Sequence, residues 1–131
     1  MDDLQKFLEL PDVGDITEEV FVSARLGKFK VRAMTAEEHG EYMKRARGKI
    51  DRKNKDVDFD AGKFNLLVAI GQTVYPDFSN AELLKKAGCS TASEFMKRKL
   101  KAGEIAELAE KICEISGFDS DINEDIEEAK N

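Results

Sequence analysis

The sequence predicts a mainly α domain of the α+β class, in which an N-terminal β-hairpin precedes a bundle of about five helices. Alternating apolar and polar residues mark the hairpin at about 20–34, and repeated helix-capping signals mark helices at about 36–116. The chain has 131 residues, of which 41% are hydrophobic, and this suits one domain with its own core. We therefore expect a single globular domain over 1–118 and an acidic flexible tail over 119–131.

A short amphipathic helix is predicted over residues 2–10. Leu4, Phe7 and Leu8 recur at helical spacing and so share one face. Pro11 follows and ends the helix. This segment precedes the hairpin.

The hairpin prediction rests on the strings VFVSARL and FKVRAM, in which side chains alternate on either side of Gly27-Lys28. Alternation on both sides of a glycine turn is typical of two paired strands. A lone two-stranded hairpin is only marginally stable in water. It must therefore pack on the helices, or it must add a strand to another chain, and both readings stay open. Under the second reading, the candidate partner-binding residues are Phe21, Arg25, Phe29 and Val31, with Ile122 and Ile126 in the tail.

Capping signals predict the helices, and no further strand pattern is evident after Met34. Thr35-Ala-Glu-Glu38 has the spacing of a capping box, as do Ser79-Asn-Ala-Glu82 and Thr91-Ala-Ser-Glu94. The predicted helices span about 36–49, 58 or 60 to 75, 79–88, 91–103 and 104–116. The helix that ends near Tyr75 is apolar over much of its circumference, which predicts a central position. The string DRKNKDVD at 51–58 predicts a solvated loop, and Gly117-Phe118 predicts a Schellman ending for the last helix.

Charge and composition exclude several classes of protein. The formal net charge is −6, which argues against a dedicated nucleic-acid binder. A basic run from Lys44 to Lys55 is the best feature for such binding, and we interpret it as a solvated helix end. No apolar run approaches the roughly 20 residues that span a bilayer, and the acidic N-terminus is no signal peptide. We expect a cytosolic protein in which Cys89 and Cys113 are reduced, buried thiols.

The sequence offers no catalytic or cofactor signature, so we expect no enzyme and no cofactor. His39 is the only histidine, and no glycine-rich phosphate loop is present. Asp119, Asp121, Asn123 and Asp125 follow the spacing of a calcium-binding EF-hand loop. That register places Glu124 where the loop needs glycine and Lys130 where it needs glutamate, so we predict no metal site.

Several strings resemble one family. EVFVSARLGKFKVRAMTAEE, YPDFSNAELLKKAGCSTASEF, LKAGEIAELAEKICEISGF and the terminal EEAKN resemble the XkdN-like tail assembly chaperones of phages and prophages, from about residue 17 to the end. The resemblance implies a small cytosolic factor, without catalysis, that binds the tape-measure protein and keeps it soluble during tail assembly. It also implies that a longer form, made by ribosomal frameshifting near Lys130-Asn131, can recruit the tail tube protein.

Two other functions stay open at this point. One is a generic protein-binding scaffold or regulatory module of phage or bacterial origin. The other is a nucleic-acid-binding accessory protein that uses the basic run. The sequence leaves open whether the chain forms a homo-oligomer.

Overall fold

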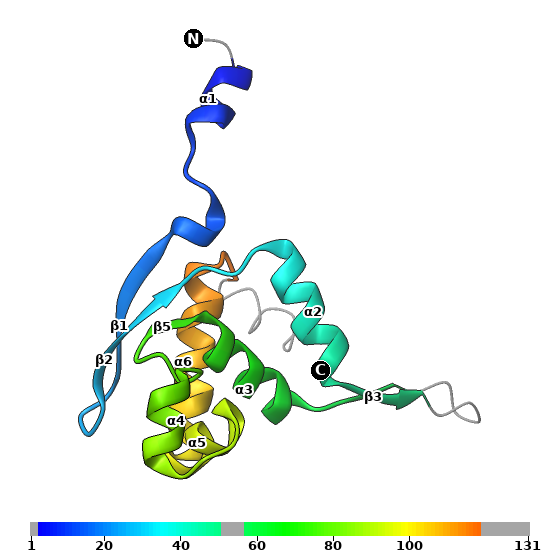
Figure 1. Cartoon of the computed structure of the whole chain (residues 1–131). Coiled ribbons are helices and arrows are strands. Elements are labelled where there is room, and N and C mark those ends of the chain that lie inside the picture. Colours follow the sequence, from blue (N-terminus) through cyan, green and yellow to red (C-terminus); the bar gives the residue numbers. More distant parts are fainter. Residues whose placement is uncertain (1–2, 51–56, 119–131) are drawn as a thin grey trace.

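The structure is a computed structural model that describes residues 3–50 and 57–118. It confirms a mainly α chain of the α+β class in which a hairpin precedes five helices within these ranges. In order, the elements are α1 (Asp3–Glu9), the 3-10 helix η1 (Val13–Asp15), β1 (Thr17–Ser23), β2 (Gly27–Arg32), α2 (Ala36–Ala46), β3 (Arg47–Ile50), β4 (Val57–Phe59), α3 (Ala61–Gln72), β5 (Thr73–Tyr75), α4 (Ala81–Ala87), α5 (Ala92–Lys99) and α6 (Ala102–Ile115). Figure 1 shows the hairpin beside the helices, with α1 extending from one end.

The hairpin belongs to a three-stranded antiparallel sheet with the order β1-β2-β5. Val20 lies opposite Phe29 in the first pair of strands, and Val31 lies opposite Thr73 in the second. The turn precedes Gly27 rather than following it, because Gly27 takes a φ of 75° and begins β2. A positive φ is easily adopted only by glycine, so the predicted turn is displaced by a few residues but uses the same glycine.

One face of this sheet packs on the helices and forms the core. Val20, Val22, Phe29 and Val31 belong to a single buried cluster with residues of α3, α5 and α6. Its fully buried members outside the sheet include Met96, Leu108 and Ile112. The hairpin therefore packs on the helices, the first of the two readings that the sequence left open.

The prediction that no strand follows Met34 was wrong. The helix expected to reach residue 49 ends at Ala46, because Arg47 is extended and begins β3, which pairs with β4. The amide of Asp60 donates to the carbonyl of Ala46 at 2.9 Å and closes the base of this second ribbon. The predicted loop at 51–58 was thus wrong at its end, where β4 begins, while 51–56 lies outside the described residues.

The central helix ends three residues earlier than predicted, at Gln72 instead of Tyr75. Thr73, Val74 and Tyr75 are β-branched or aromatic, and such residues favour strands. They form β5 on the edge of β2, so Val74 and Tyr75 do not share the helical face that the sequence predicted. Both are exposed instead.

The helix caps follow the sequence closely. The Thr35 hydroxyl accepts from the amide of Glu38, and the Glu38 carboxylate accepts from the amide of Thr35, which is the predicted capping box. Thr91 also caps α5 as predicted, and Asp60 caps α3, which therefore begins at the later of the two predicted starts. After Gly117, the amide of Phe118 donates to the carbonyl of Cys113 at 2.9 Å, confirming the Schellman ending.

Two predicted boundaries need correction. Asn80, not Ser79, caps α4, since its side-chain oxygen accepts from the amide of Leu83. Gly103 does not close α5, which ends at Lys99, but lies in the first turn of α6.

Candidate functional site: an apolar groove with a basic rim

The described residues form a groove of about 550 Å³ between α3, α5 and α6, near the end of α2. Its floor is apolar because each helix turns small or aliphatic side chains towards it. Leu66, Leu67 and Ile70 come from α3 at helical spacing, and Ile105 and Ala106 come from the first half of α6. Leu66 is buried, Ala106 is exposed and the other three are half-buried. The groove thus offers apolar surface to a ligand, and its volume lies within the roughly 300–1,000 Å³ of typical ligand sites.

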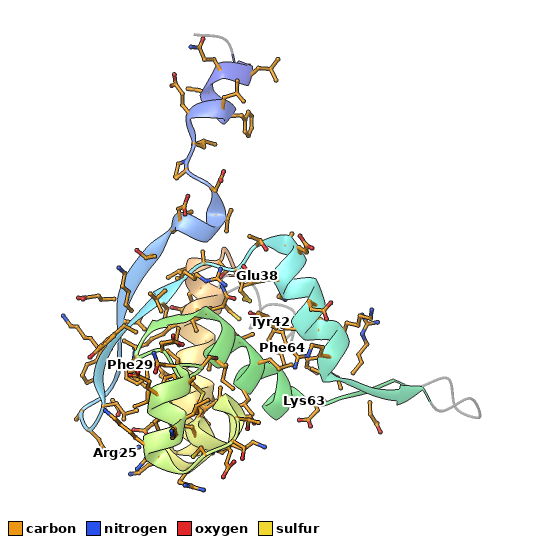
Figure 2. All side chains as sticks on the ribbon, viewed as in Figure 1. Arg25, Phe29, Glu38, Tyr42, Lys63 and Phe64 are labelled. Atoms are coloured by element: carbon orange, nitrogen blue, oxygen red, sulfur yellow. The ribbon has the colours of Figure 1, made fainter. Side chains whose placement is uncertain are left out.

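The rim of the groove carries three exposed cations, Arg45 from α2, Lys63 from α3 and Lys97 from α5. None of them forms an ion pair with another described residue. Asp60 is the one acidic residue in the lining. Figure 2 shows Lys63 at the start of α3, away from the β1-β2-β5 sheet. Such a site favours apolar partners that also carry negative charge.

Part of the basic run from Lys44 to Lys55, which the sequence predicts as a solvated helix end, lies on the rim of the groove. Arg45 lies on the rim, while Arg52, Lys53 and Lys55 lie outside the described residues. Tyr42, the aromatic residue nearest this run, donates its hydroxyl to the Gln72 side chain at 2.6 Å. It is therefore held against α3 and not presented for stacking on bases, and Figure 2 shows it between α2 and α3.

The predicted helix at the N-terminus is present as α1, but it buries nothing. Leu4, Phe7 and Leu8 are 76%, 74% and 86% exposed, and Leu10, just beyond the helix, is 60% exposed. In Figure 1 the helix lies apart from the folded body. This is a second apolar surface: the periodicity of residues 2–10 predicts the helix, but not that its apolar face lies uncovered by the other described residues.

The predicted partner-binding residues of the hairpin separate into two pairs. Phe29 and Val31 are 5% and 0% exposed, so these two side chains belong to the core and not to an exposed surface. Phe21 is 51% exposed, and the Lys111 ammonium lies 5.8 Å from the centre of its ring. The same ammonium donates to the carbonyl of Phe21, so α6 occupies a backbone acceptor of β1 that an added strand could use. Ile122 and Ile126 lie outside the described residues.

Arg25 is engaged within the chain. Its guanidinium donates to the Glu104 carboxylate and, at 2.9 Å, to the carbonyl of Lys99. Ser23 also donates to Glu104, at 2.6 Å, and the amide of Lys101 does so at 2.7 Å. The bonds from Arg25 and Ser23, with that from Lys101, lower the pKa of Glu104 to about 2. This cluster fixes the hairpin turn to the start of α6, which makes Arg25 a structural residue.

The histidine contacts aromatic rings, and both cysteines are free thiols. The centre of the His39 ring lies 4.7 Å from that of Phe118 and 5.8 Å from that of Phe64. Cys89 and Cys113 are not bonded to each other, and burial raises the pKa of Cys113. A raised thiol pKa disfavours the nucleophilic thiolate. Among residues 3–50 and 57–118, no group of three metal-ligating side chains gathers, and no helix is long and apolar enough to cross a membrane.

The sequence did not predict a binding site at the groove residues. A signal was present, because Leu66 and Ile70 lie on a different face of α3 from Phe64 and Val68, and one face is enough for packing on a single neighbour. Which helices pack against this second face, and how much of it they leave exposed, could not be predicted from the sequence.

Comparison with known proteins identifies the family. A sequence model of the family described as "Phage XkdN-like tail assembly chaperone protein" matches residues 4–130. The phage-like element PBSX protein XkdN of Bacillus subtilis (strain 168) is 39% identical over 75 residues, which cover 56% of this chain and 51% of XkdN. YqbN of the same strain is 40% identical over 73 residues, 55% of this chain and 48% of YqbN. This chain therefore spans about half the length of the curated relatives it matches.

A solved structure is also similar. The crystal structure of the protein YqbN superimposes with a TM-score of 0.66 at 28% identity, covering 91% of this chain and 99% of that one. The family match extends over nearly the whole chain, and the fold agrees with that of a relative. The chain belongs to the XkdN-like family of phage tail assembly chaperones.

Proposed function

We propose that this chaperone acts without catalysis and binds the tape-measure protein of a phage tail, holding it soluble while the tail is assembled. The observation that carries this proposal is the apolar groove with a basic rim, on a chain whose family is described as tail assembly chaperones. A protein that keeps another chain soluble needs apolar surface for binding and charge for dispersal. The groove supplies the first, and the net charge of −6 supplies the second.

The geometry favours an amphipathic helix as the bound segment. Leu67, Ile70 and Ile105 present apolar groups from two packed helices, and an apolar helical face fills such a groove through residues at spacings of three and four. Acidic residues beside that face would meet Lys63 and Lys97. We therefore propose that the bound segments of the tape-measure protein are amphipathic and acidic at their flanks.

We further propose that a longer form of this chain contacts the tail tube protein. Lys130-Asn131 can be encoded AAA-AAC, and if Ala129 is encoded GCA the message reads A-AAA-AAC, a heptamer on which paired transfer RNAs can slip. An extension that binds the tail tube protein would let one molecule hold two partners at a raised local concentration. The test is to read the codons of 129–131 and to search by mass spectrometry for a longer product with the same N-terminus. A codon set that does not allow slippage contradicts the longer form.

Co-expression tests tape-measure binding. A tape-measure protein from the genome that encodes this chain is expressed alone and together with it, and the soluble fraction is measured. We expect the tape-measure protein to aggregate alone and to remain soluble and co-purify when the chaperone is present. If its solubility is unchanged by the chaperone, the proposed function is wrong.

A matched pair of variants assigns the binding to the groove. Lys63→Glu with Lys97→Glu reverses two charges on the rim, and Lys85→Glu with Lys86→Glu makes the same charge change on α4, outside the groove. All four side chains are exposed, so both variants should fold. We expect the rim variant to lose most of its tape-measure protein and the α4 variant to retain it. Equal loss in both would reflect net charge and would contradict a role for the groove.

A further inference from the structure

Almost all of the net charge of this chain lies in the acidic tail, residues 119–131, which follows the last described residue. The tail holds six carboxylates and one lysine, a net charge of −5, so the rest of the chain has a net charge of only −1. Its two large apolar residues, Ile122 and Ile126, are four positions apart. Residues four apart share one face of a helix, so a helical tail would present both isoleucines together, with carboxylates beside them.

The groove between α3, α5 and α6 has the complementary chemistry. Its floor includes Leu67 and Ile105, which are half-buried and so keep apolar surface available. Its rim carries Arg45, Lys63 and Lys97, and none of these cations forms an ion pair with another described residue. A segment that combines two isoleucines with six carboxylates matches the floor by its apolar groups and the rim by its charge.

The described chain ends within reach of the groove. The Phe118 ring lies 4.7 Å from that of His39 in α2, and the His39 ring lies 5.8 Å from that of Phe64 in α3. Lys63 on the rim is the next residue along α3, and Figure 2 shows both near the start of this helix. The eight residues from Phe118 to Ile126 can extend over about 26 Å, whereas the whole of α3 is only about 18 Å long. Ile126 can therefore reach any part of the floor that α3 forms.

We propose that, in the free chaperone, the acidic tail occupies the groove of its own chain, with Ile122 and Ile126 on the floor and its carboxylates beside the rim cations. Covalent attachment favours the same chain over a second copy, because a short tether gives an effective concentration on the order of 1 mM. The proposal uses the groove of the proposed function but does not require tape-measure binding. A tape-measure segment of similar chemistry would compete with the tail for this site.

Photo-crosslinking within the purified full-length chain tests this contact. A photoreactive phenylalanine analogue replaces Ile126, the protein is irradiated without any partner, and cross-linked peptides are identified by mass spectrometry. The sample is an equal mixture of unlabelled and nitrogen-15-labelled protein. A link within one chain joins two peptides of the same label, whereas links between copies also join peptides of different labels. We expect same-label links from position 126 to residues 62–70 of α3 and 102–106 of α6.

Two double variants, each made in the chain that carries the analogue, test the role of the rim. Lys63→Glu with Lys97→Glu reverses two rim charges, and Lys85→Glu with Lys86→Glu makes the same charge change on α4, outside the groove. All four side chains are exposed, so both variants should fold. We expect the rim variant to lose most of the same-label links to the groove and the α4 variant to keep them.

Three results would overturn the proposal. They are links from position 126 that map outside the groove, links that join different labels as often as equal ones, and equal loss of links in the two variants. The first shows another site for the tail, the second shows docking between copies, and the third shows an effect of net charge alone. None of these results bears on tape-measure binding, which the co-expression experiment measures separately.

Discussion

Arg25 in the hairpin turn donates a hydrogen bond to Glu104 in the first turn of α6, joining positions 79 residues apart in the chain. The Glu104 side chain is only 9% exposed, whereas that of Arg25 is 47% exposed. The carboxylate also accepts from Ser23 and from the backbone of Lys101. The ion pair is therefore one part of a cluster that orients the sheet on the last helix.

This cluster predicts a loss of stability in acid. The folded-state pKa of Glu104 is about 2 and its ordinary value is 4.5, so the unfolded chain binds a proton first as the pH falls. The stabilisation is fully present above about pH 5 and disappears as the pH falls towards 2. Glu104→Gln should thus lower the free energy of unfolding at pH 7, and the difference from the wild type should shrink at pH 3. Urea unfolding at the two pH values measures this, with Glu110→Gln as the exposed control. A difference that is the same at both pH values would contradict the role of the charge.

The Tyr42 hydroxyl satisfies a buried amide. Gln72 is 0% exposed, accepts from Tyr42 at 2.6 Å, and donates to the carbonyl of Ala33 at 3.1 Å. Tyr42→Phe leaves the Gln72 oxygen buried without that donor and should cost about 1–3 kcal/mol of unfolding free energy. Tyr75→Phe removes a hydroxyl from an exposed ring and should change stability by less than about 0.5 kcal/mol. Equal effects in denaturant titrations would show that the bond to Gln72 contributes nothing.

Two glycines of α3 should respond in opposite directions to alanine. A Cβ at Gly71 would lie 2.0 Å from the Tyr42 hydroxyl oxygen, so Gly71→Ala must displace that ring and break its bond to Gln72. At Gly62 the nearest atom is a carboxylate oxygen of Asp60, at 3.5 Å, which is ordinary contact. We expect Gly71→Ala to lower the melting temperature, and Gly62→Ala to leave it unchanged or to raise stability by up to about 1 kcal/mol. Stabilisation by Gly71→Ala would contradict the close approach of α2 and α3.

The buried hydroxyl of Thr73 should lower the stability of the fold. It is 7% exposed, and its oxygen has no hydrogen-bond partner among the described residues. Thr73→Val keeps the shape and the strand preference while removing a buried polar atom, so it should stabilise the chain by about 1 kcal/mol. Thr35→Val should instead destabilise by about 1 kcal/mol, because it removes the cap of α2. Calorimetric melting of both variants checks the opposite signs, and a less stable Thr73→Val would refute this account of the position.

Local signals predicted the parts of the fold that local chemistry decides. The capping residues Thr35, Asp60 and Thr91 act as the sequence predicted, because a cap is satisfied by amides three residues away. The three short strands after Met34, which are β3, β4 and β5, were missed for the opposite reason. Thr73–Tyr75 forms a strand only because the edge of β2 lies beside it, and Val31, which lies opposite Thr73, is 42 positions earlier in the chain.

The candidate site also combines parts that local sequence predicts with parts that depend on the tertiary fold. The helix α1 was predicted from its own periodicity, but its exposure depends on what the rest of the chain leaves uncovered. The hairpin was read as a candidate surface, yet Val31 lies in the middle strand of a sheet that packs on α6. The groove depends on the relative placement of three helices, and no segment by itself encodes it.

The most direct test of the central claim is site-specific photo-crosslinking of the chaperone to the tape-measure protein. A photoreactive phenylalanine analogue is placed at Ala106 in the groove or at Glu82 on α4, both exposed and both on helices. The two proteins are co-expressed and irradiated, and the products are identified by mass spectrometry. We predict a cross-link to the tape-measure protein from position 106 and none from position 82. Equal cross-linking from both positions, or cross-linking from position 82 alone, would contradict the claim that the groove between α3, α5 and α6 binds the tape-measure protein.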